Sequence, residues 1–240
     1  MRITFLGTRG NIEAARRRHR RHSAAMIHRC GRRVMVDCGA DWLGLIAQLA
    51  PDAIVLTHAH PDHADGLRAG APCPVHASAE TWAVIGGYPI AQRRALAPRV
   101  REVIAGIGFR ACPVQHSLRC PAVGYRIEAG GATLFYLPDV AAFPDHRAAL
   151  AGIALFIGDG ASITRPILRE HDGVRLGHAP IRTQLGWCRD AGVRDALFTH
   201  CGSEIVGGDE RRLGAKLRAL ARDCGVRARI AYDGLEIDLS

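Results

Sequence analysis

Three histidines and two aspartates fall within the nine residues of segment 57–65. Neutral imidazoles and carboxylates are the usual protein ligands of zinc, iron and manganese. His58 and His60 are two residues apart and can point to the same side, whereas Asp62 and His63 are adjacent and must diverge. This spacing favours two metal ions over one. The alternative is a solvated polar loop, but a match of this kind rarely arises by chance.

Further residues of the same ligand type follow other short apolar runs, which predict buried strands. The run 53–56 precedes the cluster, and 111–114 precedes His116. The run 135–137 precedes Asp139, and 196–198 precedes His200. Taken singly, such a residue would usually be a capping or core polar group. Because strand ends that meet at one edge of a sheet commonly form a site, the four together predict one site.

The elements that must position these residues are strands in both halves of the chain, with fewer helices. Strands are expected at 3–6, 24–28, 32–36, 53–56, 74–76, 108–114, 123–128, 133–137, 153–157, 196–198, 227–231 and 235–237. Helices are expected at 41–49, 78–85, 181–191 and 210–222, the first two capped by Asp41 and Ser78. No linker and no internal repeat interrupts the pattern. We therefore expect one α/β domain over residues 1–240, with two packed sheets and outer helices.

The composition agrees with a globular α/β protein, since 48% of the residues are hydrophobic and 27 are glycine. The net charge of +9 comes almost entirely from arginine, because Lys216 is the only lysine. This bias is compatible with an anionic substrate, although a GC-rich genome produces it too. The eight cysteines include no Cys-x-x-Cys pair, which favours reduced thiols. The start has no signal-peptide pattern and no apolar run could span a membrane, so we expect a cytoplasmic protein.

The motif His-x-His-x-Asp-His, followed by a distant His, a distant Asp and a last His, resembles the metallo-β-lactamase superfamily over nearly the whole chain. Segments 5–8 and 36–39 match the family as well. The resemblance implies an αββα sandwich with two divalent metals at one edge, either zinc or manganese, with iron also accepted. By position, one metal would be held by His58, His60 and His116, the second by Asp62, His63 and His200, and Asp139 would bridge them. The metals would make hydroxide available near neutral pH.

A further histidine, His178, lies 22 residues before His200 (200 − 178). This offset resembles the branch that holds the tRNA 3′-processing endonuclease and the cyclic-phosphate phosphodiesterase of the carbon–phosphorus lyase pathway. There such a histidine contacts the scissile phosphate, and an acidic residue orients it. The resemblance implies that Asp159 holds His178, and that His178 and Asp62 assist proton transfer. The alternative is a helix-capping histidine without a catalytic role.

The chain departs from both members of that branch. The tRNA-processing enzymes carry His-Glu where this chain has Gly158-Asp159, and they have a long tRNA-binding arm that is missing here. The cyclic-phosphate enzyme holds a structural zinc through cysteines near its N-terminus, where this chain has arginines and histidines. The resemblance therefore implies a phosphodiesterase without naming one substrate.

The sequence thus predicts hydrolysis of a cyclic phosphate, a nucleotide or an RNA end. In the basic segment 16–22, Arg16, Arg20 and Arg21 are predicted to bind substrate phosphates, because guanidinium groups make bidentate contacts with them. A solvated surface loop is the alternative for this segment. The second functional hypothesis is a lactone, ester or thioester hydrolase with the same metals. The third is a nucleic-acid-binding protein without catalysis. The resemblance also allows a homodimer.

Overall fold

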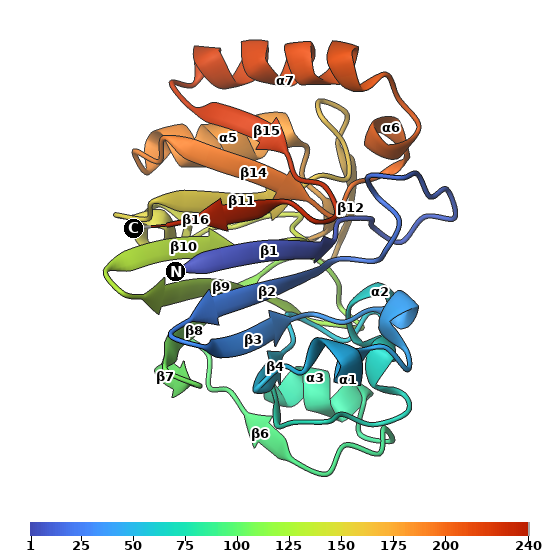
Figure 1. The fold of residues 1–240 in the computed structure, drawn as a ribbon. Helices are drawn as coiled ribbons and strands as arrows, with labels where there is room; N and C mark the ends of the chain where they lie inside the picture. Colours follow the sequence, from blue (N-terminus) through green and yellow to red (C-terminus); the bar gives the residue numbers. More distant parts are fainter. Residues whose placement is uncertain (240) are drawn as a thin grey trace.

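The computed structural model describes residues 1–239 and consists of two large mixed sheets packed face to face, with helices over their outer faces (Figure 1). This αββα arrangement confirms the predicted fold class. Sequence patterns explain it, because strands whose side chains alternate between two apolar environments must be covered on both faces. Within residues 1–239, none of the helices has the length and apolar character that a membrane crossing needs.

The first sheet runs in the order β16-β1-β2-β3-β4-β5-β6. Its strands are β1 (Arg2–Gly7), β2 (Ala24–Arg29), β3 (Arg32–Val36), β4 (Ala53–Val55), β5 (Val75–Ala77), β6 (Arg93–Ala95) and β16 (Glu236–Asp238). Short helices cover its outer face, namely α1 (Ile46–Leu49), α2 (Pro61–Ala64) and α3 (Ala79–Val84). Ser78 caps α3 as predicted, since its side chain accepts a hydrogen bond from the Thr81 amide.

The second sheet runs in the order β15-β14-β11-β10-β9-β8-β7. Its strands are β7 (Arg101–Ile104), β8 (Ile107–Val114), β9 (Ala122–Ala129), β10 (Ala132–Tyr136), β11 (Leu155–Asp159), β14 (Asp195–Thr199) and β15 (Arg227–Ile230). The remaining helices are α4 (His146–Leu150), α5 (Ile181–Asp190), α6 (Ser203–Val206) and α7 (Glu210–Asp223). A separate hairpin pairs β12 (Ile167–His171) with β13 (Val174–His178).

The central strands β10, β11 and β14 of the second sheet are buried on both faces, so their ends are held in fixed positions. Tyr136 faces the core between the two sheets, while the preceding Phe135 faces the core under the helices. Both side chains are fully buried. On β14, Leu197 faces the core between the two sheets and Phe198 faces the core under the helices. A residue that directly follows such a strand is therefore placed by packing on both sides of it.

The structure corrects the predicted helix at 41–49. A short 3₁₀ turn (Ala40–Trp42) and α1 replace it, and Gly44 between them has a positive φ of 74°, which breaks the helix. Asp41 does not cap a helix, because its carboxylate accepts hydrogen bonds from the Arg9 side chain and the His22 amide. Strand β11 begins and ends two residues later than predicted. Strands β6 and β7, the β12–β13 hairpin and helices α2, α4 and α6 were not predicted from the sequence.

Candidate metal centre

Loops at one end of the sandwich bring together all of the histidines and aspartates that were predicted as metal ligands. Three groups have ligand atoms within 4.8 Å of one another. The first group is His58, His60, His116 and Asp139, the second is Asp62, His63, Asp139 and His200, and the third is Asp139, Asp159, His178 and His200. Asp139 belongs to all three, so its carboxylate lies at the centre of the arrangement.

The motif loop reaches both groups because it changes direction at Pro61. His60 has an extended backbone, and Pro61 then starts α2, which turns Asp62 and His63 toward the second group. The loop is bonded to the end of β3 through the Cys38 amide, which donates to the His63 carbonyl at 2.7 Å. A Cβ at Gly39 would lie 2.0 Å from the Asp62 carbonyl oxygen. Glycine is therefore required where the two segments touch.

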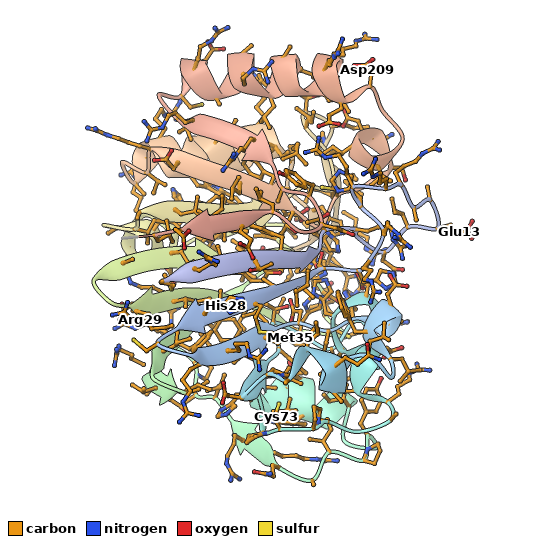
Figure 2. All side chains as sticks on the ribbon, in the orientation of Figure 1. Glu13, His28, Arg29, Met35, Cys73 and Asp209 are labelled. Carbon is orange, nitrogen blue, oxygen red and sulfur yellow. The ribbon has the colours of Figure 1, made fainter. Side chains whose placement is uncertain are left out.

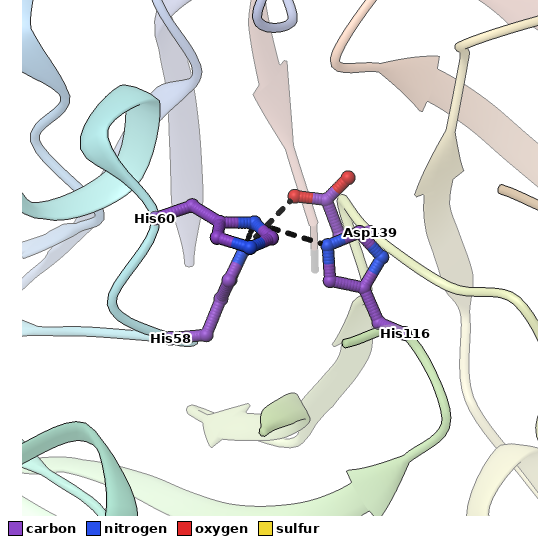
Figure 3. Close-up of side chains that lie close together, drawn as sticks. All are labelled: His58, His60, His116 and Asp139. Atoms are coloured by element: carbon purple, nitrogen blue, oxygen red, sulfur yellow. Dashed lines mark hydrogen bonds and ion pairs between the residues drawn. The ribbon is translucent and has the colours of Figure 1, made fainter. Parts of the chain in front are cut away.

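In the first group, imidazole nitrogens converge beside Asp139 (Figure 3). The Nε2 of His58 lies 2.9 Å from the Nδ1 of His60 and 3.3 Å from Oδ2 of Asp139. The Nε2 of His116 lies 3.2 Å from the same Nδ1 of His60. The other ring nitrogen of His116 donates to the Gly177 carbonyl at 3.0 Å, so its Nε2 is left to face the group.

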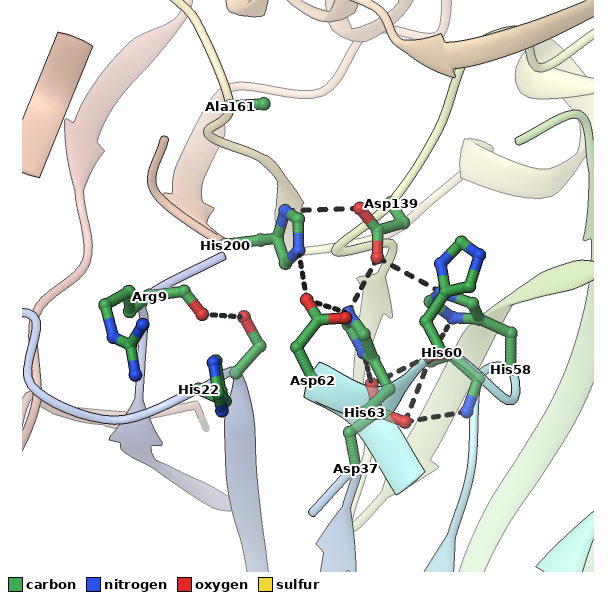
Figure 4. Close-up of polar contacts among 12 residues, drawn as sticks. Arg9, His22, Asp37, His58, His60, Asp62, His63, Asp139, Ala161 and His200 are labelled. Carbon is green, nitrogen blue, oxygen red and sulfur yellow. Dashed lines mark hydrogen bonds and ion pairs between the residues drawn. The ribbon is translucent and has the colours of Figure 1, made fainter. Parts of the chain in front are cut away.

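The second group faces both carboxylate oxygens of Asp139 (Figure 4). The Nε2 of His63 lies 2.7 Å from Oδ2 of Asp139, and the Nδ1 of His200 lies 3.2 Å from its Oδ1. The Nε2 of His200 lies 3.0 Å from the carboxylate of Asp62. These contacts cross from the loop after β4 to the loop after β14, so they depend on both sheets.

Three buried atoms in this group have no hydrogen-bond partner within residues 1–239: Nε2 of His63, Oδ1 of Asp139 and Nδ1 of His200. Buried polar atoms are normally paired, and each unpaired one is costly. A cation among these atoms would satisfy all three at once, and imidazole and carboxylate are the ligand types that zinc and manganese accept. The residues therefore fit the divalent metals that the sequence predicts.

Asp37 is a residue that the sequence analysis did not single out. Its fully buried carboxylate accepts hydrogen bonds from the Thr57 amide at 2.8 Å and from Nδ1 of His63 at 2.9 Å. Asp37 thus sets the ring orientation of His63 and aims its Nε2 at Asp139. It has a φ of +60°, in the left-handed region that is uncommon for residues other than glycine. An aspartate directly after the apolar end of a predicted strand was the available signal.

His178 and Asp159 are paired as predicted. The Nδ1 of His178 lies 2.8 Å from Oδ2 of Asp159 and 3.2 Å from Oδ1 of Asp139. The amides of Val140 and Ala161 donate to the Asp159 carboxylate, which is fully buried. The side chain of His178 is 22% exposed. His178 is therefore held from the inside and remains open to a molecule that enters the site.

The histidines divide into two electrostatic classes. Burial lowers the pKa of His58 well below its ordinary value, and burial with the nearby His116 lowers the pKa of His60 to about 4. Burial also acts on His200, but the nearby carboxylates of Asp139, Asp159 and Asp62 outweigh it and raise its pKa to about 9. For His178, burial is outweighed by Asp159 and Asp139, and the pKa rises to about 11. Without metal, the histidines of the first group are therefore neutral near pH 7, and His63 and His200 of the second group are protonated.

This difference predicts the pH dependence of metal binding. A neutral imidazole ligates directly, whereas His200, with a pKa of about 9, must lose a proton before it can bind a cation. We expect the first metal equivalent to bind with little proton release. The second should release protons and gain affinity as the pH rises from 6 toward 9. Titration calorimetry of the metal-stripped protein in two buffers of different ionisation enthalpy measures the number of protons released with each metal equivalent. Equal proton release for the two metal equivalents would contradict the difference in protonation between the histidines of the two groups.

The predicted phosphate-binding arginines lie on a loop next to the second group. The loop is tied down by Asp41, which lies 2.6 Å from the Arg9 guanidinium, and Gly10 packs against the ring of His200. Figure 2 shows Glu13 at the outer tip of this loop. Arg16 and Arg20 are exposed on it. Arg21 lies with its guanidinium 4.6 Å from the centre of the Trp42 ring.

Comparison with known proteins agrees with this geometry. Residues 32–201 match the family model described as the Beta-lactamase superfamily domain. The Ribonuclease Z of Bradyrhizobium diazoefficiens is 27% identical over 57% of this chain, which spans 44% of that protein's length. The Ribonuclease Z of Mycobacterium marinum is 25% identical over 87% of this chain and 88% of its own length. The chain thus spans less than half of one curated relative and most of the other.

Two solved structures have the same fold. Zinc-bound PqqB from Methylobacterium extorquens has a TM-score of 0.76 and 21% identity, with 100% of both chains covered. A diphosphatase of the PhnP family has a TM-score of 0.72 and 20% identity, with 99% of this chain and 97% of the other covered. The family match confirms the predicted membership of the metallo-β-lactamase superfamily, and the two solved structures confirm the predicted αββα sandwich.

Proposed function

Because the chain belongs to the beta-lactamase superfamily, we propose that it is a phosphodiesterase that works with two divalent metal ions. The observation that carries this proposal is the His178–Asp159 pair at 2.8 Å, placed beside the shared Asp139. A partly exposed histidine held by a buried carboxylate suits a reaction in which an oxygen leaves a phosphate. The names of the relatives, Ribonuclease Z and a PhnP-family diphosphatase, support the same class of substrate.

The donor groups define how the metals would be held. His58, His60 and His116 would bind one ion and Asp62, His63 and His200 the other, with Asp139 shared between them. Zinc is supported by the zinc-bound structure of the same fold, and manganese and iron suit the same ligands. When bound, such ions act as Lewis acids and lower the pKa of water. The chain's own side chains orient and protonate the reacting groups.

His178 would bind the scissile phosphate through the ring nitrogen that does not face Asp159. Asp159 and Asp139 outweigh burial and raise the pKa of His178 to about 11, so it carries a proton at neutral pH. As an imidazolium it offsets phosphate charge and can protonate the leaving oxygen. Without metal, burial raises the pKa of Asp62, but His63 and His200 outweigh this and hold it well below its ordinary value. Asp62 therefore stays ionised and would accept a proton or hydrogen bond from the attacking water.

The proposed substrates are anionic: a cyclic phosphate, a nucleotide or an RNA end. Arg16, Arg20 and Arg21 are proposed to contact their phosphates from the loop beside His200, with Arg21 held in place by Trp42. We also propose a cytoplasmic protein of one domain, in agreement with eight cysteines that all have free thiols. A homodimer remains a prediction.

A substrate panel tests the proposal against the hydrolysis of carboxylic esters. Bis-p-nitrophenyl phosphate, a 2′,3′-cyclic nucleotide, a short RNA and a lactone would each be assayed with zinc and with manganese. We expect turnover of phosphodiesters, loss of that turnover on removal of metal by a chelator, and little hydrolysis of the lactone. If the lactone is turned over while all phosphodiesters are inert, the protein is an ester hydrolase. Nucleic-acid binding with less than one metal equivalent per chain would indicate a binding protein without catalysis.

A further inference from the structure

The β12–β13 hairpin forms a small sheet of its own next to the candidate site (Figure 1). Its base is bonded to the loop that carries His116. The Gly177 amide donates to the His116 carbonyl at 2.9 Å, and the His116 ring donates to the Gly177 carbonyl at 3.0 Å. The Arg175 amide adds a bond to the Gln115 side chain at 3.1 Å. The hairpin is therefore fixed to a proposed metal ligand at its base, while β12 is exposed along its whole length.

The strand register assigns the hairpin's residues to two faces. Residues directly opposite one another in an antiparallel pair share a face, and so do alternate residues along one strand. The pairs on the face of His178 are Ile167 with His178, Arg169 with Leu176 and His171 with Val174. The pairs on the other face are Leu168 with Gly177 and Glu170 with Arg175. Since the His178 ring is bonded to Asp159 within the site, its face is the one turned toward the site.

Two exposed residues extend this face outward from His178. Ile167 is 40% exposed, although it is large and apolar. Its Cβ lies roughly 5 Å from that of His178, as expected for opposite residues in a strand pair. Arg169 follows two residues later, roughly 7 Å farther along the strand. An apolar side chain thus lies across the strand pair from His178, and a cation lies beyond it along β12, toward the tip of the hairpin.

We propose that this face binds the nucleic-acid chain that continues from the phosphate at His178. Ile167 packs against the adjacent nucleoside, and Arg169 binds the next phosphate. A polynucleotide alternates flat, partly apolar bases with anionic phosphates, and proteins hold it with apolar or aromatic platforms and with basic side chains. A small cyclic phosphate would end before it reached Arg169. The inference rests on the proposed phosphodiesterase function and narrows its substrate to RNA or another polynucleotide.

The hairpin supplies matched controls for a test. Arg169→Ala is compared with Arg175→Ala, which removes an arginine from the opposite face, where it lies across the strand pair from Glu170. Ile167→Ala is compared with Leu168→Ala, since both residues are 40% exposed and they lie on opposite faces. Each variant is assayed on a short oligoribonucleotide and on bis-p-nitrophenyl phosphate. The measured quantity is the ratio of kcat/KM for the oligonucleotide to kcat/KM for the small diester.

We expect Arg169→Ala to lower this ratio by roughly tenfold, the usual effect of one lost charged hydrogen bond. The slope of log KM for the oligonucleotide against log salt concentration should become shallower by about 0.7, because one phosphate contact is lost. Ile167→Ala should lower the ratio by roughly threefold to tenfold without changing that slope. Arg175→Ala and Leu168→Ala should leave both quantities at their wild-type values.

Equal effects of Arg169→Ala and Arg175→Ala would overturn the inference, as would equal losses on both substrates. Wild-type turnover of the small diester without any cleavage of oligonucleotides would also overturn it, while the proposed function stands. If neither substrate is hydrolysed, the proposed function fails. Binding of a fluorescein-labelled oligoribonucleotide to the same variants then decides the inference separately. Weaker binding confined to Arg169→Ala and Ile167→Ala supports it, and unchanged binding refutes it.

Discussion

Replacement of Asp139 by asparagine is expected to release metal from both ligand groups and to lower phosphodiester turnover on the order of 10³-fold or more. Asp139 is common to every group of ligand atoms in the site. One carboxylate oxygen lies 2.7 Å from His63 and 3.3 Å from His58, and the other lies 3.2 Å from His200. Asparagine keeps the shape of the side chain but removes its charge and one of its two oxygens.

Metal content by mass spectrometry and kcat/KM on bis-p-nitrophenyl phosphate measure this effect. Asp145→Asn is the control, because Asp145 is an exposed carboxylate that pairs with Arg99 away from the ligand groups. It should keep the wild-type metal content and turnover. An Asp139→Asn protein that retains two equivalents of metal and most of its activity would show that Asp139 does not bridge.

Replacement of His178 by alanine is expected to lower turnover by about 10²–10⁴-fold, the usual contribution of a general acid, while two metal equivalents are retained. The ring is bonded to Asp159 and is 22% exposed, so it is positioned for the substrate. The loss should fall mainly on kcat, because the proton is needed only as the leaving oxygen departs. Substrates with a strongly acidic leaving group, such as p-nitrophenol, should suffer less than RNA does.

Two further variants make this result specific. Asp159→Asn should lower kcat in the same direction, because it removes the charge that raises the pKa of His178. His146→Ala is the control, since His146 packs beside Trp187 outside the ligand groups. Asp139, Asp159, His178 and His200 also lie close enough to bind a cation together. A His178→Ala protein that loses one metal equivalent would therefore identify His178 as a ligand and contradict its proposed role.

The sequence predicts those parts of the fold in which packing requires apolar residues at regular positions along the chain. Strands β8, β9 and β10 were found because their apolar residues face two cores. Strand β12 was missed because all of its residues are exposed, so no alternation of buried and exposed positions appears. The helix predicted at 41–49 had the right apolar spacing but is broken at Gly44. Assignment of residues 1–240 to one domain remains a prediction.

The ligand-type residues were found because metal chemistry restricts the choice of side chain. His116, Asp139 and His200 lie where strand ends were expected to meet, although their role as ligands remains a proposal. No role was predicted for Asp37 and Gly177, because they act on the ligands through hydrogen bonds, for which spacing gives no signal. The contacts of the basic segment 16–22 depend on tertiary packing. Only the structure shows that Arg21 lies over Trp42, while Arg16 and Arg20 remain exposed.

Stepwise return of metal to the stripped protein, with hydrolysis of bis-p-nitrophenyl phosphate followed at each addition, tests the central claim most directly. Zinc and manganese would be titrated separately. We expect turnover to be absent without metal and to reach its maximum at two equivalents per chain, because the two proposed ligand sets, His58 with His60 and His116 and Asp62 with His63 and His200, meet at Asp139. Turnover that is independent of metal, or a maximum at one equivalent or fewer, would contradict a two-metal phosphodiesterase.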